Sequence, residues 1–190
     1  MPLEFDTEFP KGWPFGVLKT IQWLAPLGLL ITLYMGTYLF NGVGIAIFSG
    51  WNAFLYSLIT WICYVLGVHK KAFSFNQGAG QLFIPFALMD FLVSLFFMLF
   101  FGISTLVCAI CIFEGLKYRF GVFLTYLFAT GFSLISGLAY GYFAILVYRA
   151  CPNGQLRNLS SLVIDADGTS ARPTMETNIP TSTSRPTMVV

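Results

Sequence analysis

The chain has 190 residues, of which 57% are hydrophobic and only 9% charged, and its formal net charge is +2. So little charge cannot cover a water-facing surface, which excludes a soluble domain and predicts an integral membrane protein. The one histidine, His69, excludes haem-bearing bundles and di-iron sites, which need several facing histidines. No phosphate loop, zinc-protease motif or serine elbow occurs either. We therefore expect no enzymatic activity, no cofactor or metal and no nucleic-acid partner.

The N-terminal segment, residues 1–20, is predicted to lie on the cytoplasmic side of the membrane. It begins with the acids Glu4, Asp6 and Glu8 and lacks the basic region, short apolar core and cleavage site of a secretory signal. We therefore expect the first membrane helix to remain in the mature protein.

The first apolar stretch predicts two membrane helices. No charged residue lies between Lys19 and His69, which is more than twice the ~20 residues that cross a membrane. We expect helices at about 21–40 and 51–68, joined by a turn near the glycines of residues 41–44.

Two further apolar stretches predict helices at about 86–111 and 122–148. The predicted fold class is an all-α integral membrane protein, a four-transmembrane-helix bundle over residues 21–148. Lysine and arginine accumulate on the cytoplasmic side of membranes, and of those near the helix ends six lie on the side of the termini and two on the other. The six are Lys11, Lys19, Lys70, Lys71, Arg149 and Arg157, and the two are Lys117 and Arg119. Both termini are therefore predicted to be cytoplasmic.

Asp90 is the one acid inside the apolar part of the third predicted helix. An ionised carboxylate at the centre of a bilayer costs ~2.5–3.5 kcal/mol, so its position matters. Residues 91–112 are long enough to span alone, which leaves Asp90 at the interface, accepting hydrogen bonds from the free N–H groups of the helix start. We expect this role; the alternative is a buried hydrogen bond to a neighbouring helix.

Small side chains recur every four residues in the fourth predicted helix, at Thr125, Ala129, Ser133, Gly137 and Gly141. The first helix repeats the pattern with Gly28, Thr32 and Gly36. Such stripes let helices approach closely, and the last two glycines form a GxxxG motif. They predict helix packing, either within one bundle or between copies in a homo-oligomer.

The cysteines are predicted to have two roles. Cys63, Cys108 and Cys111 fall within predicted helices and are expected to pack as small hydrophobic residues. Cys151 directly follows the fourth helix, where juxtamembrane cysteines are often palmitoylated. Palmitoylation and an unmodified thiol both remain open for Cys151.

The C-terminal tail, residues 149–190, is rich in Ser, Thr and Pro and is predicted to be disordered. Its last three residues, 188–190, have the apolar-x-apolar pattern that adds as a strand to a PDZ-type groove. We therefore list a PDZ-type domain among the expected partners, beside membrane lipids and other membrane proteins.

Three short motifs lie at the starts of the first three predicted helices. At the first, Pro14 and Gly16 lead into Lys19 and then into the pair Gln22 and Trp23. The other two are FLYS at 54–57 and LMDFL at 88–92, which contains Asp90. These segments resemble synaptophysin-type proteins of the four-helix MARVEL superfamily. We expect Lys19 to extend to the lipid headgroups, with the Gln-Trp pair at the interface.

The resemblance implies a role in membrane apposition, vesicle trafficking or the organisation of membrane proteins and lipids, without catalysis. The chain differs from synaptophysins in two parts, since a short turn replaces their long first lumenal loop and a Ser/Thr/Pro tail replaces their Tyr/Gly/Pro/Gln repeat. The first hypothesis is a scaffold of vesicle, endomembrane or plasma membranes that acts through helix association and its tail. The second is an accessory subunit of a channel or transporter complex.

Overall fold

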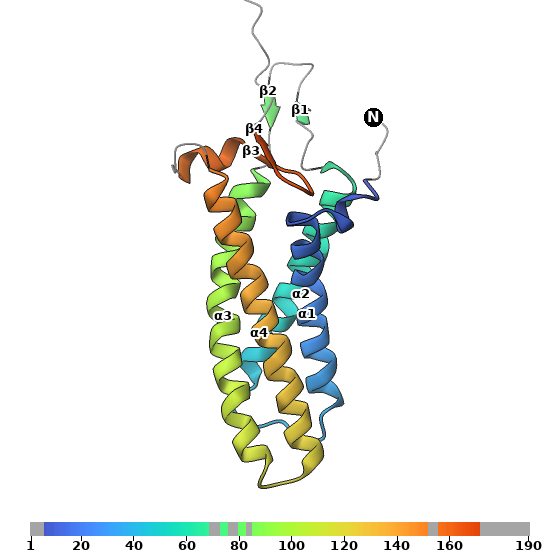
Figure 1. Ribbon diagram of the computed structural model, residues 1–190, viewed down its shortest axis with the longest axis vertical. Coiled ribbons are helices and arrows are strands. Elements are labelled where there is room, and N and C mark those ends of the chain that lie inside the picture. Colours follow the sequence, from blue (N-terminus) through green and yellow to red (C-terminus); the bar gives the residue numbers. More distant parts are fainter. Residues whose placement is uncertain (1–5, 69–72, 76–79, 83–84, 152–155, 172–190) are drawn as a thin grey trace, which may run out of the picture.

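A computed structural model describes residues 6–68, 73–75, 80–82, 85–151 and 156–171. Four long helices form an up-and-down bundle (Figure 1). They are α1 (Phe15–Met35), α2 (Gly44–Val65), α3 (Phe86–Gly115) and α4 (Phe120–Arg149). All four are long and apolar enough to cross a membrane. The protein is thus a multi-pass membrane protein, and the predicted all-α four-helix class is confirmed.

The first two helices begin and end earlier than the predicted ranges 21–40 and 51–68. The backbone becomes extended at Gly36, which ends α1. Gly42 adopts a φ of 92°, in the left-handed region that favours glycine, so the chain turns there. Ser49, which was expected in the turn, lies inside α2. Its hydroxyl donates a hydrogen bond to the carbonyl of Ile45 one turn earlier (2.8 Å), so this polar group is satisfied within the helix.

The other two helices are longer than the predicted ranges 86–111 and 122–148. Each has 30 residues, which corresponds to about 45 Å and exceeds the ~30 Å hydrocarbon core. A single tight turn, residues 116–119, joins them. Both helices are therefore long enough to extend beyond the hydrocarbon region into the headgroup layer.

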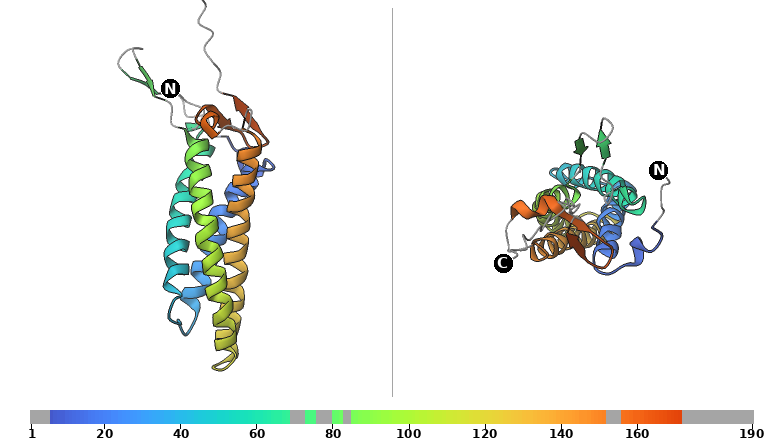
Figure 2. Two further views of the ribbon diagram at one scale, coloured as in Figure 1. Left: turned by 90° about the vertical axis from the view of Figure 1, so that its left-hand side faces the viewer. Right: turned by 90° about the horizontal axis from the view of Figure 1, so that it is seen from above.

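The helices follow one another around the bundle in sequence order (Figure 2). α1 packs against α2 and α4, and α3 packs against α2 and, along its length, against α4. We call the end where α1 begins and α4 ends the terminal end, and the opposite one the far end. The buried core of the terminal half includes Phe15, Leu18, Tyr64, Phe91, Phe143 and Val147. The core of the far half includes Leu29, Leu33, Phe97, Phe101, Ala129 and Tyr126.

Short elements cover the terminal end (Figure 1). They are η1 (Phe9–Lys11), η4 (Leu156–Ser161), β3 (Leu162–Ile164) and β4 (Thr169–Ala171), and we call them together the cap. β3 and β4 pair antiparallel, and the carbonyl of Ala166 between them accepts hydrogen bonds from the N–H groups of Phe15 (3.1 Å) and Gly16 (3.2 Å). These N–H groups have no partner inside α1, so the hairpin completes the start of that helix. A second antiparallel pair, β1 (Phe73–Phe75) and β2 (Gly80–Leu82), lies in the α2–α3 connection.

The prediction of a disordered tail over residues 149–190 is wrong for residues 156–171. Leu159, Leu162 and Ile164 are buried in the same core cluster as the ends of the helices. These apolar residues have no partner surface within the tail itself, and the exposed ends of the helices provide one. Residues 188–190, with the predicted PDZ-type motif, lie outside the described residues.

Candidate functional site

A buried ion pair joins two helices near the terminal end. Lys19 Nζ of α1 lies 2.7 Å from Asp90 Oδ2 of α3, and each residue is only 1% exposed. Two tyrosines of α2 also donate to this carboxylate, Tyr56 to Oδ1 (2.9 Å) and Tyr64 to Oδ2 (2.7 Å). One carboxylate thus binds groups from α1 and α2 and fixes the register of three helices.

The ammonium group is enclosed by aromatic rings as well. Lys19 Nζ lies 4.7 Å from the ring centroid of Phe143 in α4 and 5.3 Å from that of Tyr64. Desolvated cation–π contacts of this kind stabilise a buried cation beyond its ion pair. All four helices therefore contribute a side chain to this site, which we call the Lys19–Asp90 centre.

Two expectations for these residues are wrong. Asp90 does not cap α3, because it sits one turn inside the helix and faces α1 and α2; the alternative of a buried hydrogen bond to a neighbouring helix is correct. Lys19 does not extend to the headgroups, because its partner lies in the bundle interior. Neither α1 nor α3 shows this from its own sequence, since the contact depends on their relative register.

Gln22 lies one turn from Lys19 and is also fully buried, contrary to the interfacial position expected for it. Its two amide atoms have no hydrogen-bond partner among the described residues, and the same holds for Trp23 Nε1. The ring of Trp23 instead packs edge-on against Trp61 of α2, with centroids 6.0 Å apart. An unpaired buried amide is costly, so Gln22 marks a polar position inside the bundle.

The other two residues of the first motif shape the start of α1. Pro14 is its N-cap residue, and Gly16 lies against the carbonyl of Phe9 in η1. A Cβ atom at Gly16 would overlap that carbonyl oxygen, so glycine permits η1 to fold onto the bundle. The motif therefore has a packing role around the ion pair.

Serine, threonine and tyrosine hydroxyls form further bonds between helices. The Tyr140 hydroxyl donates to the Gln22 carbonyl (3.2 Å) and shares a 2.6 Å hydrogen bond with Ser57. Toward the far end, Ser49 and Ser104 share a 3.0 Å hydrogen bond across α2 and α3. These hydrogen bonds could not be predicted from the sequence, because the spacing of residues does not reveal which helix faces meet.

Most of the small-residue stripe packs inside one bundle. A Cβ atom at Gly28 would lie 2.7 Å from the ring of Phe132, and one at Gly36 would lie 2.8 Å from Thr125. Ala129 and Ser133 are fully buried against the neighbouring helices. The interpretation as packing within the bundle therefore holds for these four residues.

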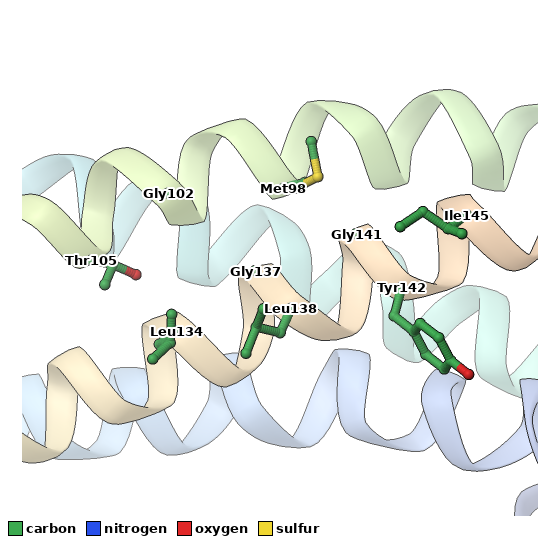
Figure 3. Close-up of a pocket in the computed structure, with 9 residues that line it drawn as sticks. All are labelled: Met98, Gly102, Thr105, Leu134, Gly137, Leu138, Gly141, Tyr142 and Ile145. Atoms are coloured by element: carbon green, nitrogen blue, oxygen red, sulfur yellow. The ribbon is translucent and has the colours of Figure 1, made fainter.

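Gly137 and Gly141 have a second surface, which opens to the outside. They line an apolar depression of about 530 Å³ between α3 and α4 (Figure 3). Its lining is Met98, Gly102, Thr105, Leu134, Gly137, Leu138, Gly141, Tyr142 and Ile145. An adjoining depression of about 420 Å³ shares three of these residues and is lined by Phe91, Leu95, Met98, Gly141, Ala144, Ile145, Tyr148 and Arg149. We call the two together the α3–α4 groove.

Three of the four cysteines are buried, and Cys63 is half-buried. Cys108 and Cys111 are buried in the far core without a disulfide, as predicted. Cys151 is 6% exposed and packs in the terminal core beneath the cap. Palmitoylation at Cys151 would require the cap to move away, so the structure favours the open alternative of an unmodified thiol.

Comparisons with protein-family models, with curated proteins and with solved structures found no match for this chain. The resemblance to synaptophysin-type proteins stays a prediction from short motifs.

Proposed function

We propose that the protein is a non-catalytic tetraspan organiser of membranes of the MARVEL type, which acts through lateral contacts within the bilayer and through its terminal cap and tail. One observation carries this proposal: apart from the amide of Gln22 and the indole N–H of Trp23, the buried polar side chains of the four spans form hydrogen bonds within the bundle. The outer wall is apolar, with large side chains such as Ile59, Leu99, Leu106 and Ile110 exposed. Such a surface offers contacts to lipid chains and to other membrane helices.

The same observation argues against a transport pathway through the bundle. A pathway needs open space lined by polar groups, whereas both oxygens of the Asp90 carboxylate are already engaged. Besides this pair, the four helices contain only Glu114 and Arg149 as charged residues, and both lie at helix ends. A proton relay across the bundle therefore lacks further acids or bases.

Site-specific photo-crosslinking in cells tests the proposal. A small diazirine side chain is placed on the outer wall at Ile59 or Leu106, which are 61% and 66% exposed, and at the fully buried Leu33 as a control. We expect discrete products with membrane proteins or with other copies of this chain from the outer positions, and products only within the chain from Leu33.

Two outcomes would change the assignment. A single channel or transporter captured in stoichiometric amount would favour the accessory-subunit hypothesis. Ion flux through purified protein in liposomes, abolished by Asp90→Asn, would contradict an organising role without transport.

A further inference from the structure

We propose that the α3–α4 groove binds one acyl chain of an anionic phospholipid, from the leaflet at the terminal end, and that Arg149 binds its phosphate. This inference deepens the proposed function by naming a lipid that the protein organises, and it rests on that function only in requiring a bundle embedded in a bilayer.

The depth of the groove comes from missing side chains. Gly102 on α3 and Gly137 and Gly141 on α4 form its floor, and longer apolar side chains such as Met98, Leu138 and Ile145 form its rim (Figure 3). A depression in the lipid-facing wall that stayed empty would forfeit dispersion contacts on every lining atom. Flexible apolar matter must therefore fill it.

The dimensions fit a single chain that runs along one leaflet. From Leu134 to Ile145 the groove extends about 16 Å along α4, which is about half of the ~30 Å hydrocarbon core. The adjoining depression continues it to Tyr148 and Arg149 at the end of the helix. The hydroxyl of Thr105, which lines the first depression, already donates to the carbonyl of Phe101 (2.7 Å), so it requires no polar ligand group.

A second transmembrane helix fits this groove less well than an acyl chain does. Close helix contact through GxxxG needs glycine faces that are free, whereas Gly137 and Gly141 already lie against α3. A Cβ atom at Gly137 would be 3.4 Å from Phe101, and one at Gly141 would be 3.0 Å from the sulfur of Met98. These contacts with α3 therefore occupy the glycine faces that a second helix would need.

The charge at the end of the groove selects the headgroup. Arg149 is exposed at the last position of α4, and no hydrogen bond or ion pair occupies it within the described part of the chain. A guanidinium group binds phosphate through two parallel hydrogen bonds. A juxtamembrane cation also prefers anionic over zwitterionic lipid, and the strength of this preference corresponds to about fivefold.

Native mass spectrometry of the full chain, released from nanodiscs of equal parts phosphatidylserine and phosphatidylcholine, tests the proposal. We expect one retained phospholipid for each bundle, with phosphatidylserine enriched about fivefold. Gly102→Leu places a side chain in the groove at a position where a Cβ atom has nothing within 4 Å. It should reduce retention at least tenfold. Gly131→Leu, whose Cβ position is equally open but lies outside the groove, is the matched control.

Arg149→Gln should keep the retained lipid but remove the preference for phosphatidylserine. As a measurement that needs no variant, phosphatidylserine with a photoreactive acyl chain should label the segments 98–105 and 134–145 of the wild-type protein. Equal retention in Gly102→Leu and Gly131→Leu, or labelling spread evenly over the outer wall, would overturn the proposal. If no lipid were retained but the crosslinks from Ile59 and Leu106 to other proteins were unchanged, the lipid site would be contradicted. The proposed organising function would not be.

Discussion

In the terminal half of the bundle a charged pair joins the helices, whereas in the far half small and apolar side chains do so. The Lys19–Asp90 centre takes at least one group from each helix and is enclosed by rings and by the cap. The far half relies on close approach, as between Gly28 and Phe132, and on hydrogen bonds between uncharged groups, such as that between Ser49 and Ser104. The two halves therefore fix their helices by different interactions.

The difference has a physical consequence for how each half responds to change. A buried ion pair depends steeply on both partners, because removal of one leaves an uncompensated charge in a medium that solvates it poorly. Packing contacts are each weaker and are spread over many atoms. We therefore expect the terminal half to fix the register of the bundle and the far half to adjust locally.

Asp90→Asn should have the largest effect, because it leaves the Lys19 ammonium buried without a counter-charge. We expect the free energy of unfolding, measured by reversible unfolding in mixed micelles, to fall by about 3–5 kcal/mol. The asparagine oxygen still accepts a hydrogen bond from a tyrosine of α2, so the loss reports on the charge.

Two controls make this result specific. Lys19→Met combined with Asp90→Asn should recover most of the stability, because no isolated charge remains. Glu114→Gln breaks an exposed pair, Lys117 and Glu114 at 2.9 Å, and should cost less than about 1 kcal/mol. If the double variant were as unstable as Asp90→Asn alone, the pair would not be the interaction that holds the terminal half.

The number of spans could be predicted from the sequence, whereas the Lys19–Asp90 centre could not. Long stretches without charge require membrane crossings, and this depends on composition alone. The position of Asp90 depends on how far α3 slides along α1 and α2. Residues 91–112 are long enough to span by themselves, so hydropathy allowed an interfacial Asp90. Only the packed bundle shows that α1 already begins at Phe15, which places Lys19 at the level of Asp90.

The tail illustrates the same limit. Ser/Thr/Pro composition predicts disorder for a segment alone, and the apolar run near Leu159 was too short to fold by itself. It folds onto side chains that the helices leave uncovered at their ends, including Phe9 and Phe143. The stripe of small residues was predictable as a packing feature, but which glycines face a neighbour and which open to lipid depends on helix rotation.

Gly28→Leu tests the packing of the far half and should have an intermediate effect. The added side chain would meet the ring of Phe132, since even a Cβ atom would lie 2.7 Å from it. We expect a loss of about 1–3 kcal/mol in the same unfolding assay, typical of overpacking. Gly131→Leu makes the same exchange at an open position of α4 and should cause no loss. Equal stability of the two variants would show that close approach does not hold this half together.

The smallest effect is expected for the hydrogen bond between Ser49 and Ser104, an uncharged polar contact of the far half. Each hydroxyl also bonds to a carbonyl of its own helix at 2.8 Å, so neither is left unpaired when the other is replaced by alanine. A double-mutant cycle of the two alanine variants should give a coupling of about 0.6 kcal/mol, the average for such bonds in membrane bundles. The same cycle on Lys19 and Asp90 should give a coupling several times larger. Similar couplings in the two cycles would break the distinction between the halves, because the interhelical polar bonds would then contribute alike regardless of charge.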